Sequence, residues 1–112
     1  MAKYHNCKTT CLSKHLHDSR LESDYCNRLL AMKQACEIQD YKIQQEFELP
    51  AGIKIIVDFL VWRWQDGKLI QEAHETKGMW TSTSRLKARL FKEKYPYIPY
   101  IVIQKRRNKW NR

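Results

Sequence analysis

A hairpin in the middle of the chain constrains the fold more than any other feature of the sequence. Residues 53–64 read IKIIVDFLVWRW, an almost unbroken apolar run rich in β-branched and aromatic residues. Such a run is typical of a central strand covered on both faces. Asp66 and Gly67 form the Asp-Gly signature of a tight turn, and residues 68–77 alternate polar and apolar side chains as a partner strand would. We therefore expect this hairpin to lie at the centre of a sheet.

The segment before the hairpin predicts one helix and one strand. Apolar residues recur every three or four positions over residues 18–38, which indicates an amphipathic helix. Either Asp18 or Ser19 can cap its first turn, because a short side-chain oxygen accepts from the free N–H groups there. Residues 41–49 alternate in polarity as a strand does, and residues 50–52 supply the turn into the hairpin.

The segment after the hairpin predicts a second helix and a last strand. Residues 81–95 begin with several capping residues and end before Pro96. The apolar face expected for this helix consists of Leu86, Leu90 and Phe91. The strand at residues 97–104 follows a crossover helix, so we expect it to run parallel to a neighbour. The resulting fold class is α/β (α+β), with a mixed central sheet flanked by helices.

Length and charge limit the function. A chain of 112 residues is one domain; we divide it into residues 1–104, with an N-terminal arm at 1–17, and a basic tail at 105–112. The formal net charge is +9, and the tail KRRNKWNR contributes five of these charges, so the rest of the chain carries +4. A small domain with this excess most often binds a polyanion, of which nucleic acid is the commonest, although a solvated basic surface is the alternative.

The sequence favours a reducing cytoplasm. No window approaches the roughly 18 consecutive apolar residues of a membrane span. The N-terminal stretch MAKYHNCKTTC is polar and lacks the apolar core of a signal peptide. We therefore expect no membrane partner, and thiols rather than disulfides at the four cysteines.

The residues that can perform chemistry lie on the two hairpin strands. Asp58 is the lone acid in the apolar strand, and a carboxylate there is costly unless it is paired or binds a metal. Pairing the strands about Asp66-Gly67 places Asp58 opposite Glu75. Lys77 lies two residues beyond Glu75, so both side chains project from one face. The hairpin therefore brings two carboxylates and one ammonium to one place.

Such a group suits hydrolysis of a phosphate ester. Hard cations such as Mg²⁺ prefer oxygen ligands and neutralise charge on a phosphate, and Lys77 can orient water or stabilise developing negative charge. Glu22, on the first turn of the helix, can add a metal ligand or a base. Two alternatives stay open: Glu75 and Lys77 as a solvated face, and Asp58 as half of a buried ion pair with a core lysine or arginine.

A family resemblance rests on six sequence blocks in a fixed order. They are KYHNCKT, DSRLES, QQEF, VDFLVW, ETKG and SRLKARLFKEKYPYI, and the resemblance spans about residues 3–103. With a helix acid, a strand aspartate and an acid-x-lysine on the next strand, the chain resembles the PD-(D/E)XK nuclease superfamily. Within it, the blocks resemble a group of small phage-encoded endodeoxyribonucleases. Val57 departs from the pattern, because it stands where the superfamily name has proline.

The resemblance implies a restriction-endonuclease-like αβββαβ core and a role for each site residue. Asp58, Glu75 and the Thr76 carbonyl would hold Mg²⁺, which Mn²⁺ would replace, and Glu22 would complete the site. Lys77 would position the attacking water. Gln44 would be the auxiliary polar residue of the preceding strand, because its rival Gln45 shares a face with Ile43 and Phe47. The resemblance also implies a homodimer that acts on branched DNA such as Holliday junctions.

Two basic segments can contact DNA. The second helix begins just after Lys77 and carries the cations Arg85, Lys87, Arg89 and Lys92. Phosphate contacts of this kind position a duplex without reading its sequence. The tail adds Trp110, which can stack on a base, and a cluster of positive charges whose binding depends on salt. These tail cations include Lys105, Arg106, Arg107 and Lys109.

Other interpretations remain beside the endodeoxyribonuclease. The spacing of Cys7, Cys11, His15 and His17 differs from the usual zinc finger, so free thiols and surface histidines are favoured over a zinc site. A non-catalytic DNA-binding or packaging accessory protein on a nuclease-like fold is the main alternative function. The intact acids argue against it, since a binding module needs no acid within a central strand. An RNA-directed nuclease is a third option.

Overall fold

The predicted hairpin is the centre of the sheet. In the computed structural model, which describes residues 9–10, 16–17, 19–106 and 109–111, β4 (Lys54–Gln65) and β5 (Lys68–Thr76) pair antiparallel from Gln65↔Lys68 to Phe59↔His74. The turn residues Asp66 and Gly67 both have positive φ, of 52° and 79°. Positive φ at both central residues matches the right-handed twist of the strands, which is why Asp-Gly suits this hairpin.

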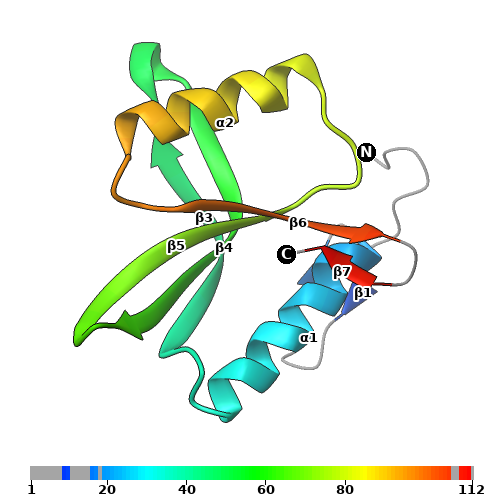
Figure 1. Ribbon diagram of the computed structural model, residues 1–112. Helices are drawn as coiled ribbons and strands as arrows, with labels where there is room; N and C mark the ends of the chain where they lie inside the picture. Colours follow the sequence, from blue (N-terminus) through cyan, green and yellow to red (C-terminus); the bar gives the residue numbers. More distant parts are fainter. Residues whose placement is uncertain (1–8, 11–15, 18, 107–108, 112) are drawn as a thin grey trace.

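The remaining elements surround this hairpin (Figure 1). β3 (Asp40–Glu48) pairs antiparallel with β4, and β6 (Tyr100–Arg106) runs parallel to β5 after the crossover helix. The strand order in the sheet is β3-β4-β5-β6-β7. The other elements are β1 (Thr9–Thr10), β2 (Leu16–His17), α1 (Arg20–Gln34), the short 3₁₀ helix η1 (Pro50–Gly52), α2 (Ser82–Lys94) and β7 (Lys109–Asn111).

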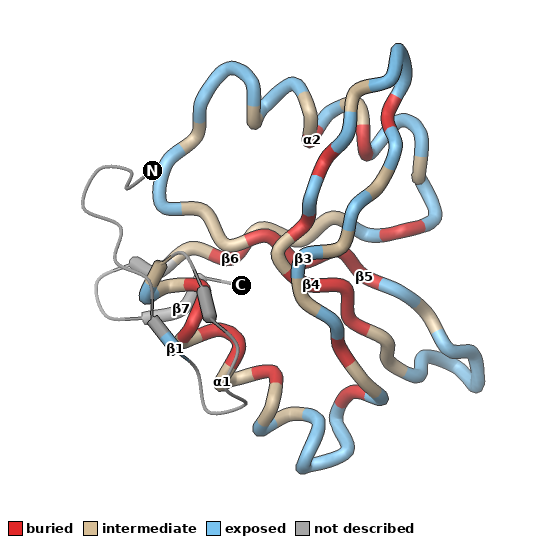
Figure 2. Tube along the Cα trace, turned by 180° about the vertical axis from the view of Figure 1, so that it is seen from behind, coloured by how far each residue is buried: buried red, intermediate tan, exposed pale blue. Residues whose placement is uncertain are grey.

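The predicted α+β class is confirmed, and so is the parallel last strand of the mixed sheet. The two helices cover opposite faces of β5. Adjacent residues on a strand point to opposite faces, and two adjacent residues of β5 contact different helices. His74 contacts Tyr25 of α1, whereas Ala73 shares an apolar cluster with Phe91 of α2. Figure 2 shows buried residues along the central strands and exposed ones at the turns. Within the described part of the chain, neither helix has the length and apolar character needed to span a membrane.

Four details of the prediction are wrong. α1 ends at Gln34 rather than 38, since Cys36 adopts a left-handed φ of 62°. Leu86 is 51% exposed, whereas α2 buries the predicted Phe91 and also Ala88. The last strand does not end at residue 104, because β6 extends to Arg106 and β7 pairs back on it. The arm likewise contains the β1–β2 pair.

The buried side chains of β4 pack in two different apolar clusters, one for each half of the strand. Phe59 and Val61 pack in a cluster with α1, whereas Ile55 and Val57, of the same parity, pack in a second cluster with Phe91 of α2. In a regular strand these four side chains would share one face. Asp58 therefore lies at the boundary between the two apolar clusters.

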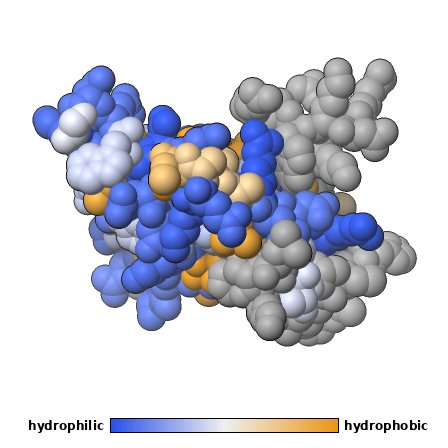
Figure 3. Space-filling model, turned by 90° about the horizontal axis from the view of Figure 1, so that it is seen from below, coloured by the Kyte–Doolittle hydropathy of each residue, from blue (hydrophilic) through white to orange (hydrophobic). Residues whose placement is uncertain are grey.

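The surface carries few large apolar side chains. The view in Figure 3 shows a mainly hydrophilic surface interrupted by small apolar patches. The exposed large apolar residues are scattered over several elements, namely Ile56, Trp64, Leu69, Met79, Leu86 and Tyr97.

Candidate functional site

Asp58 and Glu75 meet where the β4–β5 ladder ends. The last pair in the ladder is Phe59↔His74, so the next position aligns Asp58 with Glu75, as the predicted register requires. There the Asp58 carboxylate takes the place of a backbone acceptor: its Oδ2 accepts from the Thr76 N–H at 2.9 Å and from the Thr76 hydroxyl at 2.7 Å. Thr76 thus anchors the aspartate, a role that its carbonyl assignment had not suggested.

Both carboxyl groups are held in an environment that disfavours their charge. Burial raises the pKa of Asp58 above its usual value, although the bonds from Thr76 oppose the effect. Burial, followed by the charge of Asp58, raises the pKa of Glu75 to about 8. Glu75 is 5% exposed, so the solvated-face alternative is wrong for it. Its Oε1 is buried without a hydrogen-bond partner, which is unusual because buried polar atoms are nearly always satisfied.

Lys77 lies beside the two carboxyls without pairing with them. Its backbone N–H donates to the Ile103 carbonyl at 3.0 Å, which fixes it to β6. Its charge lowers the pKa of both Asp58 and Glu75, so the ammonium is within electrostatic reach of the pair. Among the ion pairs of the described residues, none involves Asp58, so the structure gives no support there to the buried ion-pair alternative.

Glu22 and Gln44 join α1 and β3 to the site. Ser19 caps α1, and its side chain accepts from the Glu22 N–H at 3.1 Å. Gln44 has a left-handed φ of 53°, and its Nε2 donates to Glu22 Oε2 at 2.9 Å. The charge of Glu22 contributes to the raised pKa of Glu75. The rival Gln45 instead donates to the Ile43 carbonyl at 3.5 Å, so geometry associates Gln44 with the acids.

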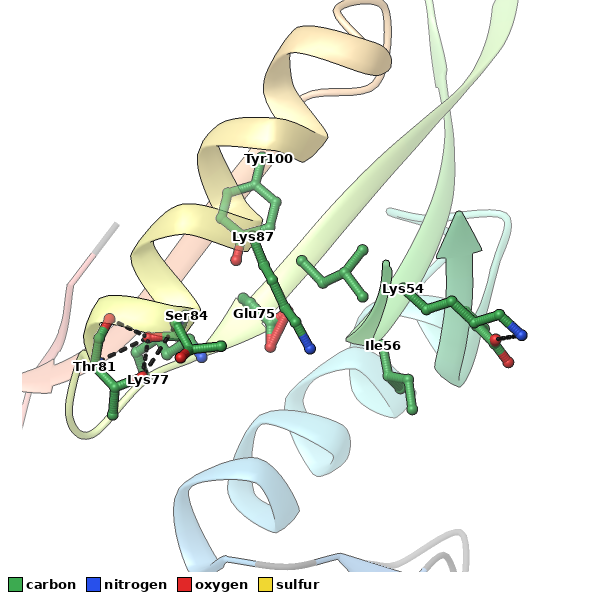
Figure 4. A pocket seen from close by; sticks show the side chains of 11 residues that line it. Lys54, Ile56, Glu75, Lys77, Thr81, Ser84, Lys87 and Tyr100 are labelled. Carbon is green, nitrogen blue, oxygen red and sulfur yellow. Dashed lines mark hydrogen bonds and ion pairs between the residues drawn. The ribbon is translucent and has the colours of Figure 1, made fainter. Parts of the chain in front are cut away.

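The site opens into a cleft of about 430 Å³ between α2 and the sheet. Figure 4 shows Lys87 extending from α2 into this cleft beside Glu75. Tyr100 lines it too, and its pKa is raised by burial and then by the charge of Glu75. Lys77 lines the cleft as well, whereas Lys54 at its far side is paired with Glu46 at 2.9 Å.

The predicted DNA contacts on α2 divide into two groups. Lys87 lines the cleft, whereas Arg85, Arg89 and Lys92 are exposed on the helix. Lys92 Nζ lies 5.6 Å from the centre of the Tyr100 ring. In the tail, Lys105 and Arg106 belong to β6 and Lys109 to β7, and their side chains fall outside the described part, as does all of Arg107.

The cysteines and histidines weighed as zinc ligands, and read instead as free thiols and surface histidines, have no described side chains. Cys7, Cys11 and His15 lie outside the described residues, and only the backbone of His17 is described, in β2.

A buried polar chain on the other face of β5 was missed by sequence reasoning. Tyr25 Oη lies 2.6 Å from His74 Nδ1, His74 Nε2 lies 3.0 Å from Glu72 Oε1, and Arg63 Nε donates to Glu72 Oε2 at 2.9 Å. The bond from His74, followed by that from Arg63, lowers the pKa of Glu72 against the effect of burial. The available signal was Glu72 and His74 two residues apart on a strand, the same spacing as Glu75 and Lys77.

The donor atoms fit a hard divalent cation better than any other group. They are carboxylate oxygens, and one of them is buried without a hydrogen-bond partner. Burial disfavours the negative charge of these carboxyl groups unless a cation compensates it. A cation there would compensate the two neighbouring carboxylates. Within the described residues no three acidic, histidine or cysteine side chains form a complete ligand set, so Asp58 and Glu75 would supply two ligands and leave other positions to water or substrate.

Comparison with known proteins yields one match. No curated protein and no solved structure is significantly similar to this chain. One family model covers residues 1–110, which is nearly the whole chain, and its description is "Protein of unknown function (DUF1064)". The chain therefore belongs to the DUF1064 family.

Proposed function

We propose that this protein is a metal-dependent endodeoxyribonuclease that hydrolyses DNA phosphodiester bonds on a restriction-endonuclease-like αβββαβ core. The observation that carries the proposal is the buried, unpartnered Oε1 of Glu75 next to Asp58. Two neighbouring carboxyls whose ionisation is disfavoured are expensive to maintain in a fold, and groups of this kind concentrate at functional sites.

The order of elements supports the same proposal. Helix α1, strands β3, β4 and β5, helix α2 and strand β6 follow the αβββαβ sequence of that core. Its acids would come from α1, β4 and β5, which carry Glu22, Asp58 and Glu75. Gln44 connects these elements, because its amide donates to Glu22 and it falls between the register pairs Ile43↔Phe59 and Gln45↔Val57, at the level of Asp58.

Each residue has a distinct role in the proposed reaction. Asp58, Glu75 and the Thr76 carbonyl would hold Mg²⁺, with the charge of Glu22 nearby, and the ion would supply charge neutralisation of the phosphate and a more acidic water. Thr76 fixes the Asp58 carboxylate through two hydrogen bonds. Lys77 orients the attacking water and stabilises the negative charge that develops on the phosphate. Gln44 holds Glu22 toward the site through its amide.

DNA would approach across α2 and the cleft. Lys87 and Lys54 line the cleft, so they would contact the phosphates that flank the scissile bond. The exposed cations Arg85, Arg89 and Lys92 extend this positive surface along α2. The proposal includes branched DNA such as Holliday junctions as the preferred substrate, a homodimer as the active form, and the host cytoplasm as its location.

The experiment is a cleavage assay on supercoiled plasmid, linear duplex and a synthetic four-way junction. Each substrate is incubated with Mg²⁺, with Mn²⁺ and with EDTA. Lys77→Ala tests the site, and Lys94→Ala is the matched control, because Lys94 is exposed seven residues beyond Lys87 on α2. Metal-dependent cutting that is lost in Lys77→Ala and kept in Lys94→Ala supports the proposal, and the preferred substrate decides between a junction resolvase and a general nuclease.

A binding measurement on the same proteins separates catalysis from affinity. Asp58→Asn and Glu75→Gln remove charge from the site, so they should abolish cleavage while DNA affinity stays within about threefold of wild type. Retained binding with no cutting of any substrate by the wild-type protein would instead identify a DNA-binding accessory protein. Cutting by both variants at the wild-type rate would show that the acids are misassigned.

A further inference from the structure

Trp80 lies between the proposed catalytic lysine and helix α2. Lys77 Nζ is 5.2 Å from the centre of the Trp80 ring, and Arg85 Cζ is 5.6 Å from it. Both distances fall within the roughly 6 Å range of a cation–π interaction, and tryptophan is the strongest aromatic partner for a cation. One half-buried ring therefore contacts two cations, of which Lys77 lines the cleft.

The backbone next to Trp80 is held by the N-terminal capping box of α2. The next residue, Thr81, is the N-cap of α2, and its hydroxyl accepts from the Ser84 N–H at 3.0 Å. Ser84 Oγ in turn accepts from the Thr81 N–H at 2.8 Å, which completes a capping box. Arg85 lies in the first turn of this capped helix, so both the ring and its second cation are positioned by the helix start.

The Lys77 ammonium has the carboxyl groups of Asp58 and Glu75 within electrostatic reach, yet it lies on the Trp80 ring. Its charge lowers the pKa of Asp58 and of Glu75, but among the described residues no ion pair joins it to either carboxylate. Glu75 Oε1 accordingly has no partner. An ammonium that moved onto this oxygen would occupy the place of a divalent cation and would compete with it directly.

We propose that Trp80 is a positioning residue that holds the Lys77 ammonium off the Asp58–Glu75 pair and so keeps that pair open to a divalent cation. The inference rests on the proposed metal site. It assigns Trp80 a role in metal binding, although its side chain is no metal ligand.

The test is a titration of the metal-free protein with Mn²⁺ alone, in which free Mn²⁺ is measured by electron paramagnetic resonance. Trp80→Leu should bind Mn²⁺ about two- to fivefold more weakly than wild type, the range that loss of one cation–π contact allows. Trp80→Phe keeps a weaker aromatic face and should fall between them. Trp62→Leu is the matched control, because Lys42 Nζ lies 5.8 Å from the Trp62 ring, outside the cleft, and this variant should bind as wild type does.

The same substitution in a Lys77→Met protein shows whether Trp80 affects Mn²⁺ binding through the Lys77 ammonium. In Lys77→Met the competing ammonium is absent, so adding Trp80→Leu should leave Mn²⁺ affinity unchanged. Equal affinity of Trp80→Leu and wild type would overturn the inference, and so would an equal loss in the Lys77→Met background. Should Trp80→Leu lose the wild-type far-UV circular dichroism, Trp80→Phe against Trp62→Phe decides by the same criterion. A wild-type protein that binds no Mn²⁺ would instead overturn the metal site itself.

Discussion

Glu75→Gln should make the metal-free protein more stable while it destroys the proposed site. In the folded protein the pKa of Glu75 is raised from an ordinary value of 4.5 to about 8. The folded state therefore binds a proton that the unfolded state has released. Glutamine has nearly the shape of the protonated acid and cannot ionise, so it removes this difference between the two states.

The magnitude and its sign follow from proton linkage. The penalty is absent below pH 4.5, where both states are protonated, and it grows as pH rises from 4.5 to about 8. Each pH unit in that window costs about 1.4 kcal/mol, so the penalty at pH 7 approaches about 3 kcal/mol. We expect Glu75→Gln to raise the free energy of unfolding by about 2–3 kcal/mol at pH 7 and by much less at pH 5.

Urea unfolding followed by tryptophan fluorescence at pH 5, 7 and 8.5, in EDTA, measures this difference. Glu93→Gln is the matched control, because Glu93 is exposed on α2 and its change should stay within about 0.5 kcal/mol at every pH. Adding Mg²⁺ should then stabilise the wild type and not the variant, because a ligand stabilises only the state that binds it. A Glu75→Gln protein less stable than wild type at pH 7, or a gain that does not grow with pH, would refute the reasoning.

Three further changes test separate parts of the structure. Thr76→Val removes the 2.7 Å hydrogen bond from the hydroxyl to Asp58 but keeps the bond from the backbone N–H. The cleavage rate should fall about tenfold with little change in melting temperature. A wild-type rate would show that the hydroxyl is dispensable. His74→Ala removes two buried hydrogen bonds, to Tyr25 and to Glu72, and the buried ring. It should lower the free energy of unfolding by about 2–4 kcal/mol in urea titrations, whereas a loss below 1 kcal/mol would contradict that burial. Lys87→Ala should lower the slope of DNA affinity against salt concentration by about one phosphate contact, measured by fluorescence anisotropy. Lys94→Ala should lower this slope less. Equal slopes for the two variants would exclude Lys87 from the interface.

Local patterns predicted the sheet well, because the hairpin signals are strong and short-ranged. The Asp66-Gly67 turn fixed the register, and the register alone placed Asp58 opposite Glu75. The position of β6 followed from its crossover helix. Local patterns could not predict contacts whose partners lie far apart in sequence, such as Tyr25 with His74 or the Gln44 bond to Glu22.

The errors at the ends of elements have a common physical origin. Periodicity continues past Gln34, but the backbone turns out of the helix at Cys36, and only the left-handed φ reveals this. Leu86 matches a helical apolar face by spacing alone, whereas the sheet contacts α2 through Ala88 and Phe91. Trp80 was missed because a cation–π pair three residues apart in a loop has no sequence period.

The division of the interior at Asp58 affects how the protein tolerates change. Phe59 and Phe91 belong to different apolar clusters, so substitutions at these two positions should combine additively in their effects on stability. Asp58 and Gln44 occupy the same position along the β3–β4 pair, where the clusters separate, and substitutions there should couple to both sides. Either half of the interior can then be repacked in relatives of this chain while the acids at the boundary keep their geometry.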